Sequence, residues 1–312
     1  MSGSTAWRPG RVHVRAPGKL NLFFEVGDVQ PDGYHDVASA YQAVSRYEDC
    51  WAEEADDFTI SVTGAVDVSG VPSDDRNLAL RAARLLAKEI GHRGGVHLEI
   101  VKQVPVAGGM GGGSADAAAA LVACDALWSA DLGTAQLQRL ASRLGADVPF
   151  ALMGGTAVGT GRGDQLSPAL AKGRFDWVIV PDAGGLSTPA VYGRLDELRS
   201  RRSVDIAPPP RAPAVAPEVL QALRAGDASV LAEHARNDLQ VAALSLRPDL
   251  RETLELGERS GALVGLVSGS GPTLAFLAAG PEDALELQVT LSASGRTALH
   301  VHGPVAGARV LG

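Results

Sequence analysis

The sequence predicts an α+β protein of two packed domains, and three observations support this prediction. The chain has 312 residues, enough for two cores, and its 46% apolar and 21% charged residues are typical of a globular protein. Strand and helix patterns alternate through the first half, as in an α/β domain. The second half closes with the order strand, strand, helix, strand, which is typical of an α+β domain. We place the domains at residues 1–163 and 164–312, because a glycine-punctuated strand ends the first half.

The first half is predicted to open on strands. Two strand patterns near the N-terminus are interrupted at Pro17-Gly18, and residues 30–33 form a turn signal. The clearest helix is 77–91, in which apolar residues recur on one face and Gly91 follows the last turn. We expect strands at 12–16, 20–26, 58–63 and 96–101, and helices at 77–91, 115–128 and 134–144.

The second half is predicted to hold short strands and several helices. A helix at 188–200 has Thr188 as its N-cap and Pro189 at its first helical position. Prolines at 208–213 indicate an extended connection inside the second domain, because proline continues neither a helix nor a central strand. The other elements expected here are strands at 177–180, 263–267, 273–277 and 297–302, and helices at 217–225, 228–237, 249–260 and 281–293.

Charge and composition argue against several classes of partner. The net charge of −8 offers no long basic face for a nucleic acid. Residues 1–11 lack an apolar leader, and no stretch reaches the roughly 18 apolar residues of a membrane span. Cys50 and Cys124 are too few and too far apart for a disulfide framework or a zinc site. We therefore expect a cytoplasmic protein that acts on a small molecule, with no nucleic-acid or membrane partner.

A glycine-rich segment is the strongest functional signal. Residues 105–116 read PVAGGMGGGSAD, with five glycines at the six positions 108–113, and lead directly into an alanine-rich helix. Without Cβ atoms, successive backbone N–H groups can turn toward one point, and the helix start adds free amides and its positive dipole end. We expect an anion there, most simply the phosphates of a nucleotide. The segment lacks the lysine of a P-loop and the dinucleotide fingerprint, and a plain glycine-rich turn is the alternative.

Three further segments carry polar residues in apolar surroundings. Lys19 and Asn21 are two residues apart on a strand and so share one face, although a lysine that extends to solvent is the alternative. Asp147 follows a predicted helix end, where a local turn or cap is the alternative. Residues 268–273, SGSGPT, form a second glycine-serine loop, which either contacts a ligand or closes a tight hairpin.

Together, these segments resemble the motifs of the GHMP small-molecule kinases. That superfamily has a Pro-Gly-Lys type motif near the N-terminus, a glycine-rich phosphate loop in the middle and a third glycine-rich motif near the C-terminus. This chain shows them in that order at 17–19, 105–115 and 268–273. The resemblance implies a two-domain GHMP kinase fold with an N-terminal ATP-binding α/β domain, a C-terminal ferredoxin-like α+β domain and the active site in the cleft between them.

Within that superfamily, the chain resembles the 4-diphosphocytidyl-2-C-methyl-D-erythritol kinases from residue 12 to residue 310. The motifs that carry this resemblance are KLN at 19–21, GYH at 33–35, GADVPF at 145–150 and GTGRG at 159–163. It implies ATP- and Mg²⁺-dependent phosphorylation of the 2-hydroxyl of 4-diphosphocytidyl-2-C-methyl-D-erythritol, in the non-mevalonate route to isoprenoid precursors, by a monomer or weak homodimer. A kinase for another alcohol, of homoserine or mevalonate type, and a non-catalytic sensor on the same fold are the alternatives.

The resemblance also implies roles for single residues. Lys19 is the candidate cation near the γ-phosphate, and Asp147 is the candidate base or orienting group at the acceptor hydroxyl. Ser114 is the candidate contact for a β-phosphate or Mg²⁺, and Asp116 should point away from the phosphates or reach that ion. The implied ATP-binding residues are Asn77, Lys102, Pro105, Val106, Ala107, Gly108, Gly109, Met110, Gly111, Gly112, Gly113, Ser114 and Ala115. The implied substrate-binding residues are Asn21, Tyr34, His35, Thr188, Tyr192, Gly269, Ser270 and Gly271.

Four of these assignments have local alternatives. Lys102 could equally be a solvated lysine at a strand end, and Asn77 could simply start helix 77–91. Thr188 could act only as an N-cap, and Tyr192 could pack as an ordinary residue on a helix face.

Overall fold

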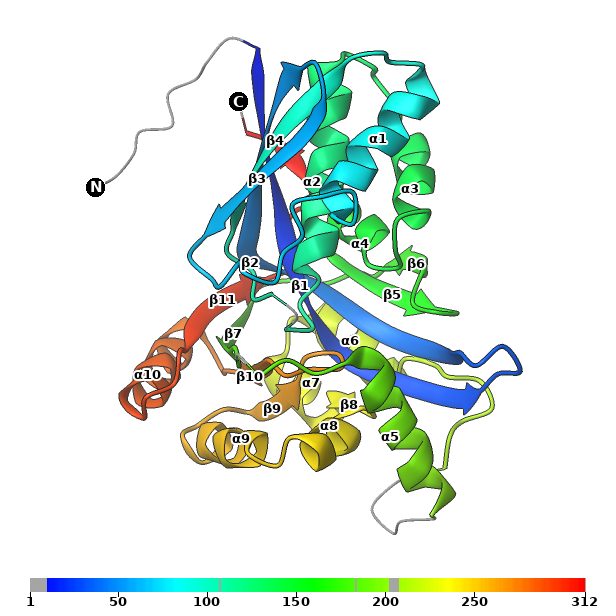
Figure 1. Ribbon diagram of the computed structural model, residues 1–312. Helices are drawn as coiled ribbons and strands as arrows, with labels where there is room; N and C mark the ends of the chain where they lie inside the picture. Colours follow the sequence, from blue (N-terminus) through cyan, green and yellow to red (C-terminus); the bar gives the residue numbers. More distant parts are fainter. Residues whose placement is uncertain (1–9, 107, 183, 202–207, 312) are drawn as a thin grey trace.

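The computed structural model describes residues 10–311 except for 107, 183 and 202–207. Figure 1 shows two parts, each a sheet with helices packed on it, joined by a long hairpin that runs from the first part along the second. The hairpin consists of β1 (Arg11–Val29) and β2 (His35–Ala55), which are antiparallel. Its inner half belongs to the core of the first part, and its outer half lies against the second part.

The first part is built on an eight-stranded sheet. Its central path has the order β12-β1-β2-β4-β3, in which β3 and β4 are parallel. The strands β5 and β6 extend the sheet beside β2, and β8 pairs with β1. The bounds of these strands are β3 (Phe58–Gly64), β4 (Gly95–Lys102), β5 (Thr156–Thr160), β6 (Gln165–Pro168), β8 (Arg236–Asn237) and β12 (Arg309–Val310).

Four helices accompany this sheet. They are α1 (Leu78–Ile90), α2 (Gly112–Leu127), α3 (Thr134–Ser142) and α4 (Val148–Met153). The central helix α2 presents mostly alanine side chains to its neighbours, and these are fully buried between the sheet and α1. Small side chains allow a close approach of backbones, so the start of α2 is held firmly at the end of the glycine-rich segment.

The second part is a ferredoxin-like domain. Its four antiparallel strands have the order β11-β7-β10-β9, and α9 and α10 pack against them. Further helices connect β7 to β9, and α5 lies beside the β1–β2 hairpin (Figure 1). The bounds are β7 (Phe175–Val180), α5 (Thr188–Ser200), α6 (Pro217–Ala225), α7 (Ala228–His234), α8 (Gln240–Leu246), α9 (Leu250–Arg259), β9 (Val264–Val267), β10 (Leu274–Leu277), α10 (Pro281–Ala293) and β11 (Leu299–Gly303).

The predicted two-domain α+β fold is confirmed, with local corrections. The two strands predicted around Pro17-Gly18 are one strand, because a register shift there absorbs the irregularity. The sequence patterns missed β2, β6, β12, α4 and α8. The helix predicted at 228–237 was wrong at its end, because α7 stops at His234 and Arg236–Asn237 pair with β1 as β8. The N-cap of α5 is Ser187, so the prediction of Thr188 was wrong by one residue. Because β6, β8 and β12 also join the first sheet, the boundary at 163 and 164 stays a prediction.

Candidate active site

The glycine-rich segment is held between β1 and the loop that joins β9 to β10. The backbone N–H of Lys19 donates to the Met110 carbonyl at 3.0 Å, and the Ser268 hydroxyl donates to the Gly109 carbonyl at 3.2 Å. Gly109 has a φ of +76°, and a Cβ there would lie 2.1 Å from the Ser268 carbonyl oxygen. Only glycine fits this position, so two motifs far apart in the sequence meet through it. Ala107 lies outside the described residues.

A first cavity of about 340 Å³ lies along this segment and the start of α2. Its size is within the range of small-molecule sites. The N-cap of α2 is Gly111, which has no side chain that could accept a hydrogen bond from the first amides of the helix. An anion at this end of the cavity would accept from them. The cavity is lined by Gly70, Val71, Pro72, Leu78, Lys102, Pro105, Val106, Gly108, Gly109, Gly111, Gly112, Gly113, Ser114 and Asp116.

Asn77 does not line this cavity but supports its wall. Its side-chain oxygen accepts from the Ala79 amide at 2.9 Å and caps α1, and its side-chain nitrogen donates to the Pro72 carbonyl at 2.7 Å. Pro72 is one of the lining residues. The residue that starts the helix therefore also fixes the loop before it, which lies against the cavity.

Lys102 lies in a buried group of three charges rather than at a solvated strand end. Its ammonium nitrogen Nζ is 2.6 Å from Glu48 Oε1 and 2.6 Å from Asp116 Oδ2. Burial and the charge of Asp116 raise the pKa of Glu48 to about 7, and burial raises the pKa of Asp116. Burial opposes the charge of Lys102, but the two carboxylates outweigh it and raise the pKa of the ammonium. Asp116 is thus turned toward Lys102, and its charge near the phosphate cradle is compensated.

A second cavity, of about 250 Å³, adjoins the first and shares Gly109 and Gly111 with it. Its polar wall holds Lys19, Asn21 and Asp147. The ammonium nitrogen of Lys19 donates to Asn21 Oδ1 at 2.6 Å and lies 3.7 Å from Asp147 Oδ2. The other lining residues are Phe24, Val37, Tyr41, Gly109, Gly111, Arg162, Thr188, Tyr192, Leu239, Gly269 and Ser270.

A chain of hydrogen bonds orients this polar wall. The Asn21 amide donates to the Ser39 hydroxyl at 2.8 Å, and that hydroxyl donates to the Phe23 carbonyl at 2.9 Å. Asn21 must therefore present its oxygen to Lys19. Asp147 stands at the N-cap position of α4, but its side chain makes no cap bond. Its carboxylate remains available to the cavity, where 31% of the side chain is exposed.

Two tyrosines frame the cavity as neutral phenols. Burial, followed by the charge of Asp147, raises the pKa of Tyr41 well above its ordinary value. The same two causes raise the pKa of Tyr192. Both phenols keep their protons at neutral pH and can donate hydrogen bonds.

Helix α5 closes the cavity from the second domain. The hydroxyls of Thr188 and Ser270 are 2.8 Å apart and bridge α5 to the second glycine-serine loop. The rings of Tyr192 and His35 lie 5.1 Å apart. Gly271, in the same loop, is not among the lining residues of this cavity, and a Cβ there would lie 2.9 Å from Val267 and 3.3 Å from Leu186.

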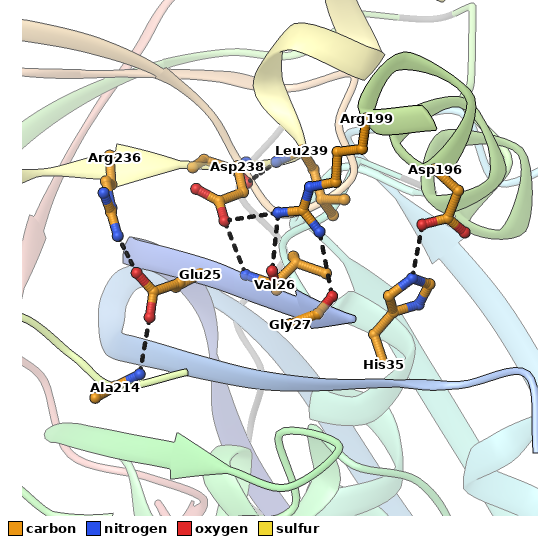
Figure 2. Close-up of polar contacts among 11 residues, drawn as sticks. Glu25, Val26, Gly27, His35, Asp196, Arg199, Ala214, Arg236, Asp238 and Leu239 are labelled. Carbon is orange, nitrogen blue, oxygen red and sulfur yellow. Dashed lines mark hydrogen bonds and ion pairs between the residues drawn. The ribbon is translucent and has the colours of Figure 1, made fainter. Parts of the chain in front are cut away.

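Polar contacts hold α5 against the β1–β2 hairpin, as Figure 2 shows. Arg199 donates to the carbonyls of Val26 at 2.8 Å and Gly27 at 3.1 Å, and it also contacts Asp238. His35 Nε2 lies 2.9 Å from Asp196 Oδ1. The helix that carries Thr188 and Tyr192 is thereby fixed to the strand that carries Lys19 and Asn21.

A third pocket, of about 350 Å³, lies at the tip of the hairpin. It contains Tyr34 and His35, and it shares Arg162 with the second cavity. Tyr34 is 58% exposed, and the guanidinium carbon of Arg162 lies 4.0 Å from the centroid of its ring.

The fold thus brings most of the predicted residues to two adjoining cavities. Lys19, Asn21 and Asp147 meet with Thr188, Tyr192, Gly269 and Ser270 in the second, while Tyr34 and His35 lie in the pocket beside it. The sequence patterns missed Glu48, Ser39, Tyr41, Arg162 and Asp196. Glu48, Ser39 and Tyr41 are on the unpredicted strand β2, and Arg162 lay in a quoted motif to which no role was assigned.

Comparisons with known proteins agree with this architecture. A family model for the GHMP kinases N terminal domain matches residues 77–155, and one for the GHMP kinases C terminal region matches residues 219–297. A homoserine kinase from Cytophaga hutchinsonii superposes with a TM-score of 0.74 at 17% identity, over 99% of this chain and all of that one. The chain is a GHMP kinase, an ATP-dependent small-molecule kinase.

Its place within the superfamily follows from more similar proteins. The 4-diphosphocytidyl-2-C-methyl-D-erythritol kinase of Leifsonia xyli is 62% identical over 96% of this chain and 98% of its own length. That of Clavibacter michiganensis is 60% identical over 96% of each chain. A crystal structure of 4-(cytidine 5'-diphospho)-2C-methyl-D-erythritol kinase superposes with a TM-score of 0.75 at 32% identity, over 93% of this chain and 98% of that one. The chain belongs to the 4-diphosphocytidyl-2-C-methyl-D-erythritol kinase family.

Proposed function

We propose that this kinase transfers the γ-phosphoryl group of ATP to the 2-hydroxyl of 4-diphosphocytidyl-2-C-methyl-D-erythritol through Lys19 and Asp147, giving the 2-phosphate and ADP. One observation carries the proposal. The cavity along the glycine-rich segment and the cavity that holds Lys19 and Asp147 meet at Gly109 and Gly111. A phosphoryl donor in the first and an alcohol in the second would be in contact only at that point.

The glycine-rich segment binds the donor phosphates. The first residues of α2 line the first cavity, and their amides, which no N-cap side chain satisfies, supply positive potential there without a lysine in the loop. Lys19 supplies the cation at the point of transfer from a different strand, and Asn21 holds its ammonium in place. Phosphoryl transfer depends mainly on such positioning and charge stabilisation.

Asp147 acts on the acceptor. Its carboxylate accepts a hydrogen bond from the 2-hydroxyl and points the oxygen toward the γ-phosphorus. As the new oxygen–phosphorus bond forms, the bond to the β-phosphate oxygen breaks and ADP leaves with that electron pair. The hydroxyl proton passes to Asp147 late in the step, because a loose transition state needs little prior deprotonation.

The protein groups at the donor cavity fit a Mg²⁺ ion held largely by phosphates. Mg²⁺ in kinases is bound by one or two protein oxygens together with substrate phosphates. Ser114 lines this cavity, and Asp116 Oδ1 is buried there without a hydrogen-bond partner among the described residues. These two side chains would hold the ion, which would neutralise charge on the donor phosphates.

The acceptor's cytidine end lies in the pocket with Tyr34 and His35, and Tyr192 packs beside His35. Aromatic rings offer stacking faces to a base, and the imidazole offers hydrogen bonds to its edge. Homoserine or mevalonate would leave this pocket unused.

We also propose a cytoplasmic location. None of the helices in the described residues is long and apolar enough to cross a membrane.

The test is an assay of ATP-dependent phosphorylation with three acceptors: 4-diphosphocytidyl-2-C-methyl-D-erythritol, homoserine and mevalonate. We expect turnover with the first alone, and a loss of about 10² to 10⁴ in kcat in Asp147→Asn. Asp283→Asn, an exposed carboxylate in the first turn of α10, is the matched control and should keep wild-type kcat. Wild-type turnover in Asp147→Asn, or no transfer to the cytidine-linked acceptor, contradicts the proposal.

A further inference from the structure

Arg162 stands where the acceptor cavity meets the pocket beside Tyr34. Among the described residues, Arg162 is the one that lines both. Its guanidinium forms an ion pair with Asp32 and lies over the ring of Tyr34, with its central carbon 4.0 Å from the ring centroid. An acceptor with its alcohol at Asp147 and its base near Tyr34 would have to pass this side chain.

The backbone beneath Arg162 is held firmly. The Val37 amide on β2 donates to the Gly161 carbonyl at 2.7 Å, and the Arg162 amide is 3.3 Å from Asp164 Oδ1. Gly163 has a φ of +88°, and a Cβ there would lie 2.6 Å from the Tyr41 hydroxyl. The turn therefore sits directly on a residue of the acceptor cavity, and the long, exposed side chain of Arg162 can change direction without moving its backbone.

The contacts that Arg162 makes are weak enough to be replaced by contacts with a bound phosphate. About half of each side chain in its ion pair is exposed, 53% for Arg162 and 52% for Asp32. Exposed ion pairs and exposed cation–π contacts each contribute little to stability. Guanidinium binds phosphate oxygens in pairs, with shorter and stronger hydrogen bonds.

The side chains that line the acceptor cavity and the pocket beside Tyr34 carry more negative than positive charge. Counting His35 as neutral, the described lining residues of the two pockets carry two cations, Lys19 and Arg162, against three carboxylates, Asp32, Asp36 and Asp147. Lys19 is engaged with Asn21 and Asp147 at the far end. An anionic linker between the alcohol and the base would therefore meet unfavourable potential unless Arg162 neutralised it.

From these observations, and given the proposed function, we propose that Arg162 binds the diphosphate of the cytidine-linked acceptor, leaving Asp32 to do so. It is a residue that determines preference for a nucleoside diphosphate over the bare nucleoside. Its contribution lies in binding the acceptor, because the diphosphate takes no part in the bonds that form and break.

The experiment compares CDP and cytidine as competing ligands of wild type, Arg162→Gln and Arg162→Lys. We expect the CDP-to-cytidine affinity ratio to fall about 10- to 100-fold in Arg162→Gln, the value of a charge-assisted hydrogen-bonded contact, with cytidine affinity nearly unchanged. Arg162→Lys should recover part of the ratio, since it keeps the charge but loses the paired donors. Arg259→Gln, an exposed ion-paired arginine on α9, is the control.

Turnover provides the second readout. The KM for the acceptor should rise in Arg162→Gln by a similar factor, while kcat and the KM for ATP stay within about threefold. An unchanged CDP-to-cytidine affinity ratio in Arg162→Gln overturns the proposal. If the affinities for CDP and cytidine fall equally, Arg162 supports binding of the base through Tyr34 and does not bind the diphosphate. Failure of the proposed function is distinct, because the wild type would then bind these ligands but not phosphorylate the acceptor.

Discussion

Replacing Lys102 with methionine should destabilise the protein strongly, although the two side chains have similar lengths. The ammonium is the one positive charge among three buried side chains, and the side chains of Glu48 and Asp116 are 0% and 6% exposed. Removal leaves both carboxylates buried without a cation. Breaking such a pair costs about 3 to 5 kcal/mol, a large part of the 5 to 15 kcal/mol that typically stabilises a folded protein.

The loss should also depend on pH. The pKa of Glu48 in the folded protein, about 7, lies above its ordinary value of 4.5, so between these values the folded protein holds a proton that the unfolded chain releases. The stability that this proton contributes is complete below pH 4.5 and is lost as the pH rises through 7. Without the Lys102 ammonium, protonation is the remaining way to neutralise the two buried carboxylates, so the stability of the folded protein depends more strongly on pH. The destabilisation of Lys102→Met should therefore be larger at pH 8 than at pH 5.5.

Urea unfolding at the two pH values measures both effects, with midpoints and slopes compared across variants. Glu48→Gln keeps the acceptor for the Gln103 amide, leaves one carboxylate for Lys102, and should cost less than about 1 kcal/mol with a flatter pH dependence. Lys88→Met, an exposed position in the last turn of α1, is the matched control. The reasoning is refuted if Lys102→Met loses under about 1 kcal/mol, or loses the same amount at both pH values.

Three further predictions test the supports of the site. Gly109→Ala should raise the KM for ATP at least about tenfold and lower the unfolding temperature, because its Cβ would strike the Ser268 carbonyl. The control is Gly193→Ala in α5, where a Cβ meets nothing within 4 Å, and it should leave the KM for ATP unchanged and stability equal or slightly higher. Asn77→Ala should lose about 1 kcal/mol in urea unfolding by removing the cap of α1, and an unchanged midpoint would count against that role. Arg199→Met should raise the KM for the acceptor but not for ATP, since it loosens α5 from the hairpin; equal changes in both would argue against a local effect.

The buried lysine also shows how the phosphate cradle is supported. Gly112 lies against the charged group: a Cβ there would be 2.9 Å from Glu48 Oε1 and 3.2 Å from the Lys102 nitrogen. The group joins β2, the end of β4 and the second turn of α2, close to the point where the glycine-rich segment becomes helix. Loss of Lys102 should therefore loosen the donor cavity as well as lower stability.

The sequence alone determined the features that depend on local chemistry. Residues 108–113 predict a phosphate cradle because glycines let successive backbone amides turn toward one point. The predicted bounds of α6 and α10 agree with the structure because a proline starts each and a glycine follows each closely. The order of the motifs at 17–19, 105–115 and 268–273 was sufficient to identify the superfamily. Each of these signals lies within a few consecutive residues.

Only the tertiary structure decided what these residues face, and β2 explains why. Both faces of this 21-residue strand are largely buried, so it has no alternation of polar and apolar residues from which to predict it. Yet β2 brings Glu48 to Lys102 and Ser39 to Asn21. Likewise, Arg162 meets Tyr34 only because the β5–β6 turn folds back on the hairpin. Partners separated by tens to more than a hundred positions leave no local pattern, because sheet pairing and domain packing alone bring them together.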